Sequence, residues 1–269
     1  METSGGADRI AVLIDADNTS HRYAEALLDE IAKYGNPTIK RAYGDWTNAR
    51  LSGWSKELNA RAIRGMHQGA FTSGKNSTDS ALIIDAMDLL YDGNVEAFAL
   101  VTSDSDFTSL ALRLRESGKV VYGLGGAKTP ASLQNACDKF IRLELLGDDD
   151  GEADPESDPG AGQEPAENAD REPSHAPEIN LQSALTKAVN AVADDDGWAT
   201  PGAVGNHLRR THPSLDPRTY GHRGLEALLR DQPFLESGGE NGRTTVRVKG
   251  HGNAKQQKAP TKKAAAKKS

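Results

Sequence analysis

The sequence predicts an α/β fold, with a mostly parallel sheet between two layers of helices, followed by a small winged-helix (α+β) domain. Three observations support this prediction. Short apolar strands alternate with helical stretches over residues 9–147. An acidic, proline-containing stretch at 148–178 interrupts that alternation. Residues 179–249 then show three helical stretches and a pair of short strands.

Two apolar strands define the first domain. The runs RIAVLID at Arg9–Asp15 and VEAFALVT at Val95–Thr102 are short and lack helical periodicity, which predicts buried strands. Further strands are expected at Thr38–Tyr43, Ala62–Met66 and Lys119–Leu124, and helices at Tyr23–Tyr34, Leu51–Ala62, Thr78–Tyr91, Asp106–Glu116 and near Ser132–Ala136. Because strands and helices alternate at this spacing, we expect a mostly parallel sheet with helices on both faces.

The composition excludes several classes of protein. The 269 residues are 36% hydrophobic and 26% charged, and no run approaches the ~20 apolar residues of a membrane helix. Residues 1–9 lack the apolar core of a secretory signal. The single cysteine, Cys137, excludes an internal disulfide and a cysteine-based zinc site. A cytoplasmic location is therefore expected, and nothing in the sequence indicates an oligomeric state.

The net charge of −7 is unevenly distributed along the chain. Residues 148–178 hold twelve acids, one basic residue and no aromatic or branched aliphatic side chain, which predicts a disordered acidic linker. Residues 249–269 hold seven lysines and no acid, and 250–269 is expected to be a disordered tail. The predicted domains are therefore 9–147 and 179–249.

Acidic residues follow two of the predicted strands. Asp15 ends the first strand, Asp104 and Asp106 follow the strand at Val95–Thr102, and Asp79 begins the helix before it. Ligands of open parallel sheets bind beyond the carboxyl ends of the strands. Carboxylates that converge there repel each other unless a cation neutralises them. Oxygen ligands favour Mg²⁺ or Mn²⁺, which activate water and stabilise charge on a phosphodiester.

Helix capping offers a structural explanation for some of the same residues. Asp17, Asn18, Ser103 and Ser105 all follow strands, where short polar side chains cap the next helix. On the helix that Asp79 begins, Asp88 and Asp92 are expected on the solvated face. Asp85 lies about 240° around that helix from Asp79, so the two are not expected to share one site.

Three stretches resemble the NYN domain family, relatives of the PIN nucleases. They are RIAVLIDADN, KNSTDSALIIDAMDLL and FALVTSDSDFTSLALRLRESGKVVYGLG, and the resemblance covers about residues 9–146. It implies a PIN-like α/β/α fold and RNA cleavage that depends on Mg²⁺ or Mn²⁺. By the same resemblance, the catalytic and metal-binding residues are Asp15, Asp79, Asp104 and Asp106, with Asn18 as the companion of Asp15. Ser77-Thr78-Asp79 departs from the Gly-Val-Asp frequent in the family but retains the acid.

Substrate contacts, Asn18 among them, are predicted near the same edge of the sheet. Trp46 follows the second strand, where it would either stack on an unpaired base, worth roughly 1–3 kcal/mol, or pack over the edge of the core. Lys75 and Asn76 precede Asp79 in a polar loop. Lys75 would either hold a phosphate there or be an ordinary solvated lysine.

A rival interpretation of the first strand is a phosphatase. Asp15-Ala16-Asp17-Asn18-Thr19 fits the D-x-D-x-T motif of haloacid dehalogenase-like phosphatases, in which the first Asp attacks phosphate. No matching lysine segment or cap domain is evident downstream. This class is therefore a distant third hypothesis.

The second domain shows a winged-helix pattern. Leu181, Leu185, Val189 and Val192 share one face of a helix, and Thr200-Pro201 opens a second helix. A third helix is expected over about Arg218–Arg230. Phe234-Leu235 and Thr245–Val248 would then form a hairpin around Gly238–Gly242.

The stretch DDDGWATPGAVGNHLRRTHPSLDPRTYGHRGLEALLR resembles the OST-HTH (LOTUS) domain. This resemblance implies binding to RNA or to an RNA-associated protein. Candidate RNA contacts supply cationic or stacking groups: Arg209, Arg210, Arg218, Tyr220, His222 and Arg223. Together, the two resemblances predict a metal-dependent ribonuclease with an RNA-recruiting domain. The alternative is a non-catalytic RNA-binding or adaptor protein with a vestigial carboxylate pocket.

Overall fold

The computed structural model describes residues 8–67, 77–147, 179–240 and 243–249. Within these ranges the chain forms two compact units. The first unit holds the described residues up to 179 together with Arg209–Thr219, and the second holds Asn180–Leu208 and the described residues from Tyr220 onward. The predicted linker at 148–178 and tail at 250–269 lie outside the described residues.

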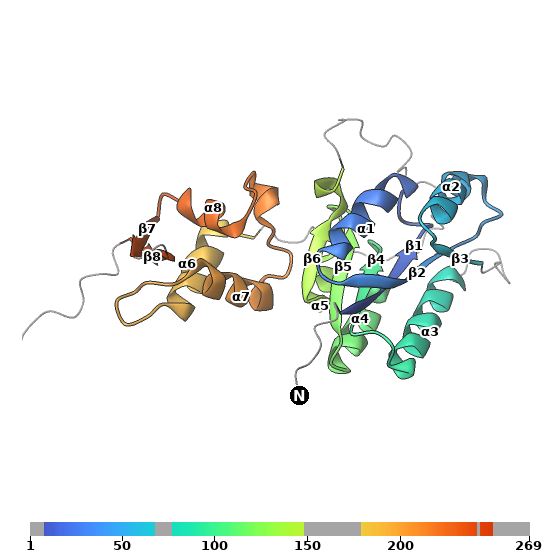
Figure 1. Ribbon diagram of the computed structural model, residues 1–269, viewed down its shortest axis with the longest axis horizontal. Coiled ribbons are helices and arrows are strands. Elements are labelled where there is room, and N and C mark those ends of the chain that lie inside the picture. Colours follow the sequence, from blue (N-terminus) through green and yellow to red (C-terminus); the bar gives the residue numbers. More distant parts are fainter. Residues whose placement is uncertain (1–7, 68–76, 148–178, 241–242, 250–269) are drawn as a thin grey trace, which may run out of the picture. The chain divides into compact units, whose positions relative to one another are not determined.

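A six-stranded parallel sheet organises the first unit (Figure 1). Its strands are β1 (Arg9–Asp15), β2 (Asn36–Gly44), β3 (Arg64–His67), β4 (Ala97–Val101), β5 (Val120–Gly125) and β6 (Lys139–Arg142). They lie in the order β3-β2-β1-β4-β5-β6, and every neighbouring pair is parallel. The mostly parallel sheet expected from the sequence is thus confirmed.

Helices cover both faces of this sheet. They are α1 (Ala24–Ala32), α2 (Ser52–Ala60), α3 (Ser77–Asp92), α4 (Thr108–Glu116) and α5 (Ala131–Ala136). Alternate residues of β1 face opposite layers: Val12 packs in the core with α1 and α2, and Leu13 packs in the core with α3, α4 and α5. The β1 strand is therefore buried on both faces, which explains its continuous apolar run.

Two local features of the first unit differ from the prediction. Strand β6 was not predicted, because Lys139–Arg142 is only four residues long and has just two apolar side chains. Helix α4 begins at Thr108 rather than Asp106, because Ser105–Phe107 forms a 3-10 turn that Asp104 caps. The cap thus moves the start of the helix but leaves both acids at the end of β4.

The described part of the chain after residue 179 contains three helices and a two-stranded antiparallel sheet. They are α6 (Leu181–Val192), α7 (Pro201–Thr211), α8 (Leu225–Arg230), β7 (Leu235–Glu240) and β8 (Arg243–Val248). The predicted helix over Arg218–Arg230 was wrong in extent. Pro217–Tyr220 forms a 3-10 turn, and Gly221 has a φ of +78°, a left-handed conformation that ends the turn before α8 starts.

No helix in the described ranges is both long enough and apolar enough to span a lipid bilayer.

Candidate active site

The sheet reverses its strand order between β1 and β4. From β1, the chain adds β2 and β3 on one side and then β4, β5 and β6 on the other. In open parallel sheets, ligands bind beyond the carboxyl ends of the strands at such a reversal. Asp15 is the last residue of β1, and Thr102 directly follows β4. Both side chains therefore start from the position where this topology places ligands.

Asp15 is a buried carboxylate with hydrogen bonds to both of its oxygens. Only 1% of the residue is exposed. The Thr102 hydroxyl and the Asn18 side-chain amide each donate to Oδ2 at 2.8 Å, and the Asn18 backbone N–H donates to Oδ1 at 3.3 Å. Burial raises the pKa of Asp15, and the hydrogen bonds from Asn18 and Thr102 oppose that rise. Asn18, predicted as a substrate contact, thus orients Asp15 in this structure.

Thr102 connects Asp15 to the loop that carries Asp104. Its Oγ1 accepts a hydrogen bond from the Asp104 backbone N–H at 3.1 Å while donating to Asp15. Thr102 does not stand out in the sequence, because a threonine at the end of a buried strand is a common strand residue. The available signal was its place directly after β4, beside the strand that ends in Asp15.

Asp104 serves as a helix cap as well as a candidate ligand. Its Oδ1 accepts a hydrogen bond from the Asp106 backbone N–H at 2.9 Å, which satisfies a donor at the start of the 3-10 turn. Within the described ranges, Oδ2 accepts no hydrogen bond from the protein. A carboxylate has about four acceptor positions, so the cap leaves Asp104 able to bind a cation. Asp106 is exposed.

Asp79 experiences the charges of the other acids. It lies in the first turn of α3 and is partly buried. Burial raises the pKa of Asp79 to about 6, with further contributions from the charges of Asp15, Asp104, Asp106 and Asp17. The loop after β1, the start of α3 and the loop after β4 therefore place their acids in one electrostatic neighbourhood.

The acids around Asp79 are suited to a hard cation, but they do not form a complete set of metal ligands in this structure. In the parts of the chain that the structure describes, no group of three or more His, Cys, Asp or Glu side chains is arranged to hold a metal ion. Mg²⁺ commonly takes one or two protein carboxylates and keeps several waters. The oxygen-only donors and their mutual repulsion fit such an ion. Direct ligation by all four predicted acids remains a prediction.

Mn²⁺ is expected to stabilise the protein in a pH-dependent way. Because the pKa of Asp79 is raised from 3.8 to about 6, the folded state binds more protons than the unfolded state between these values. The free energy of unfolding should therefore fall as pH rises through this window. A cation that binds the ionised acids reverses this loss, so Mn²⁺ should raise Tm at about pH 7.5 and have little effect at about pH 5. Thermal unfolding at the two pH values checks this, and equal shifts would contradict it.

The predicted substrate residues of the first unit have different outcomes. Trp46 is partly buried against the core beside α2, and its indole N–H donates to the Met66 carbonyl of β3 at 3.1 Å. This position corresponds to the packing alternative, while base stacking by its exposed part remains a prediction. Lys75 and Asn76 lie outside the described residues.

The other acids of α3 lie apart from Asp79. Asp88 and Asp92 are exposed, as expected for a solvated face. Asp85 is partly buried and binds Arg41 and Tyr43 of β2. The sequence had indicated that Asp85 and Asp79 do not share one site, but not what Asp85 binds.

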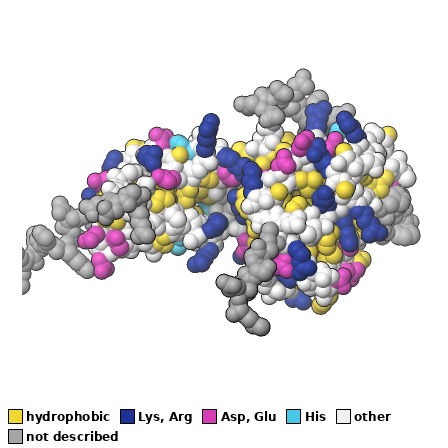
Figure 2. Space-filling model, viewed as in Figure 1, with side chains coloured by type: hydrophobic (Ala, Val, Ile, Leu, Met, Phe, Trp, Pro, Cys, Tyr) yellow, Lys and Arg dark blue, Asp and Glu magenta, His cyan; other side chains and the backbone are white. Residues whose placement is uncertain are grey.

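Five of the six candidate RNA contacts have varied surroundings. Arg209, Arg210 and Arg223 are exposed, and Arg209 also has a protein interaction. Tyr220 is partly exposed, and the His222 imidazole lies 3.6 Å from the Asp231 carboxylate. On the face shown in Figure 2, Lys and Arg side chains are interspersed with Asp and Glu rather than gathered in one basic patch.

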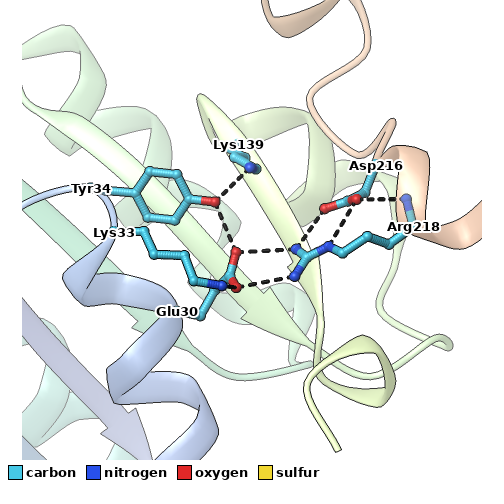
Figure 3. A network of polar contacts seen from close by, with 6 residues as sticks. All are labelled: Glu30, Lys33, Tyr34, Lys139, Asp216 and Arg218. Atoms are coloured by element: carbon cyan, nitrogen blue, oxygen red, sulfur yellow. Dashed lines mark hydrogen bonds and ion pairs between the residues drawn. The ribbon is translucent and has the colours of Figure 1, made fainter. Parts of the chain in front are cut away.

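Arg218 lies in a network of ion pairs within the first unit (Figure 3). Its guanidinium donates to both oxygens of Glu30 at 3.1 Å and to Asp216 at 2.8 Å. Glu30 also accepts hydrogen bonds from the Lys33 ammonium at 2.7 Å and the Tyr34 hydroxyl at 2.9 Å. In this conformation the Arg218 donors face carboxylates, so RNA binding by Arg218 would require these bonds to exchange.

The six-stranded parallel sheet with helices on both faces is that of a PIN-like α/β/α domain. The model of the NYN domain family matches residues 9–144, and the chain belongs to this family. The OST-HTH/LOTUS domain model matches residues 174–246, so the chain also carries the second domain that the sequence predicted.

Two similar proteins have names that state no function. One is "Uncharacterized protein MJ0482" of Methanocaldococcus jannaschii, 28% identical over 144 residues. The match covers 51% of this chain, and this chain spans only 56% of that protein's length. The other is a solved structure, "protein of unknown function VPA0982" from Vibrio parahaemolyticus, with 20% identity and a TM-score of 0.45. That match covers 52% of this chain and 96% of the solved one.

Proposed function

We propose that the chain is a metal-dependent ribonuclease that hydrolyses RNA phosphodiester bonds, and that its OST-HTH domain recruits the RNA. The observation that supports this most strongly is Asp79, whose pKa is raised to about 6 by burial and by the acids of two other segments. In the proposal, Mg²⁺ or Mn²⁺ is held by Asp15, Asp79 and Asp104, with Asp106 at the edge of the site. A cytoplasmic location is also part of the proposal.

Each part of the site has a distinct role in the proposed reaction. A divalent cation would supply a polarised water and positive charge beside the phosphate. Thr102 and Asn18 fix the orientation of Asp15. Asp79 and Asp104 come from separate backbone segments, the start of α3 and the loop after β4. The fold itself therefore positions these acids, and no contact with RNA is needed to hold them there. In hydrolysis, a water oxygen bonds to phosphorus, one P–O ester bond breaks, and the released oxygen takes up a proton.

Metal removal tests the activity directly. The full chain is incubated with labelled single-stranded and structured RNAs in Mg²⁺ or Mn²⁺, and then with EDTA. We expect cleavage with metal, loss of cleavage with EDTA, and recovery when Mn²⁺ is restored. If RNA is bound but is not cleaved under any of these conditions, the chain is the adaptor with a vestigial carboxylate pocket instead.

The proposed recruiting role predicts a salt-dependent loss of RNA affinity. Arg210 and Arg223 are exposed cations of the OST-HTH domain, so replacing both with alanine should remove up to two phosphate contacts. We expect weaker RNA binding and a slope of log affinity against log salt that is shallower by about 1–2. Fluorescence anisotropy measures both quantities. Lys187→Ala, which removes an exposed cation of α6, is the matched control, and an equal effect there would count against these two arginines.

A further inference from the structure

Asp85 joins helix α3 to strand β2 through both of its carboxylate oxygens. The Arg41 guanidinium donates to Oδ1, and the Tyr43 hydroxyl donates to Oδ2. The side chains of Asp85 and Arg41 are 16% and 20% exposed, and Tyr43 is 1% exposed. Burial and the Asp85 carboxylate raise the pKa of Tyr43, so its phenol keeps its proton and remains a donor.

Tyr43 lies directly beside the proposed site. It pairs with Asp15 in the parallel register of β1 and β2, and its carbonyl accepts a hydrogen bond from the Ala16 backbone N–H at 2.9 Å. The hydroxyl of Tyr43 therefore connects the strand next to Asp15 with the helix that carries Asp79.

Asp79 depends on its helix for its position. Asp85 lies six positions further along α3, a rise of about 9 Å. In the described ranges, no hydrogen bond to a protein group fixes the Asp79 carboxylate. Helix α3 packs on β1 and β2 through apolar side chains such as Leu82, Ala86 and Leu89. Apolar contacts are non-directional, whereas hydrogen bonds have defined geometry. The contacts of Asp85 are thus directional contacts that help to hold α3 in register with the sheet.

We propose that Asp85 is a positioning residue, which, through Arg41 and Tyr43, holds α3 where Asp79 can share a cation with Asp15 and Asp104. This inference rests on the proposed function, and it assigns Asp85 a role in that site without direct contact with metal or RNA. Outer-shell residues that fix metal ligands commonly change metal affinity by about 10- to 100-fold when mutated.

Substitution of Asp85 tests this role by metal affinity as well as by rate. We expect Asp85→Asn to raise the Mn²⁺ dissociation constant, measured by electron paramagnetic resonance, about 10-fold or more. The kcat for RNA cleavage should fall by a similar factor, with KM within about 2-fold, because RNA recruitment is unchanged. Tyr43→Phe removes only one hydroxyl and keeps the ring packed, so it serves as the second variant and should shift both values in the same direction.

Asp138→Asn is the matched control. Asp138 also uses both carboxylate oxygens, accepting from Arg115 of α4 at 3.1 Å and from the Val121 N–H of β5 at 2.9 Å. Asp138 directly precedes β6 and therefore lies at the amino end of that strand, whereas the proposed site lies at the carboxyl ends of β1 and β4. The control should lower stability without changing Mn²⁺ affinity. If Asp85→Asn and Tyr43→Phe only lower Tm and bind Mn²⁺ as tightly as the wild type, the positioning role is wrong. If the wild type itself binds no Mn²⁺, the proposed function fails instead.

Discussion

Replacing Asp79 with asparagine is expected to reduce RNA cleavage while making the folded protein more stable. Metal polarisation of a phosphate is worth several kcal/mol, so loss of one of its carboxylates should reduce kcat by about 10²- to 10³-fold. The same change removes a partly buried charge whose pKa is raised to about 6 by burial and neighbouring acids. The free energy of unfolding at about pH 7.5 should therefore rise by about 1–2 kcal/mol.

A substitution that lowers activity but raises stability indicates that the residue belongs to a binding site. A charge with a purely structural role would lose stability instead. Cleavage assays and urea denaturation of the same protein samples give both values. Asp88→Asn is the matched control, since Asp88 is an exposed acid of the same helix, and it should change neither by much. A loss of stability on Asp79→Asn, or unchanged cleavage, would remove Asp79 from the site.

Replacing Arg218 with alanine is expected to destabilise the first unit by up to about 3–5 kcal/mol, because it leaves a buried carboxylate with fewer partners. The Glu30 side chain is 3% exposed, and Arg218 donates to both of its oxygens. Lys33 and Tyr34 continue to bind Glu30, which keeps the loss toward the lower end of that range. Urea denaturation followed by tryptophan fluorescence measures the change.

A double-mutant cycle identifies the source of this loss. In the Glu30→Gln background, Arg218→Ala should lower the free energy of unfolding clearly less than in the wild type, because no buried charge remains without its partner. Arg210→Ala is the control at an exposed arginine, and its free energy of unfolding should stay within about 0.5 kcal/mol of the wild-type value. Additive effects of the two substitutions at Glu30 and Arg218 would show that their ion pair contributes no coupling.

The Glu30 network also predicts an acid sensitivity. Burial opposes ionisation of Glu30, but Arg218, Lys33 and Tyr34 together lower its pKa from 4.5 to about 2. A lowered pKa adds stability above the unfolded value, and this stability is lost as pH falls from about 4.5 toward 2. Arg218→Ala should therefore flatten the decline in stability over this acid range.

The sheet could be predicted from the sequence because its central strands are continuous apolar runs. The runs at Arg9–Asp15 and Val95–Thr102 correspond to β1 and β4, and the acids that follow them lie at the strand reversal. Strand β6 lacks such a run, and a glycine in the left-handed region at Gly221 divides what the sequence had suggested was one helix.

The buried polar partners could not be predicted in the same way. Glu30 and Asp85 lie in amphipathic helices, where an acid usually indicates a solvated face. Each has a partner that is distant in sequence, since Arg218 follows Glu30 by 188 residues and Asp85 follows Tyr43 by 42. Only the fold brings Arg218 to Glu30, whereas Asp216, the other carboxylate that binds the Arg218 guanidinium, lies two residues away in the sequence.

Anomalous diffraction from crystals of the full chain soaked in Mn²⁺ locates the cation directly. We predict a peak at the carboxyl ends of β1 and β4, about 2.0–2.3 Å from a carboxylate oxygen of Asp15 or Asp104 and within reach of Asp79. The peak should disappear in Asp15→Asn crystals grown in the same form. Crystals that diffract well and bind Mn²⁺ only elsewhere, or not at all, would contradict a shared cation at this edge of the sheet.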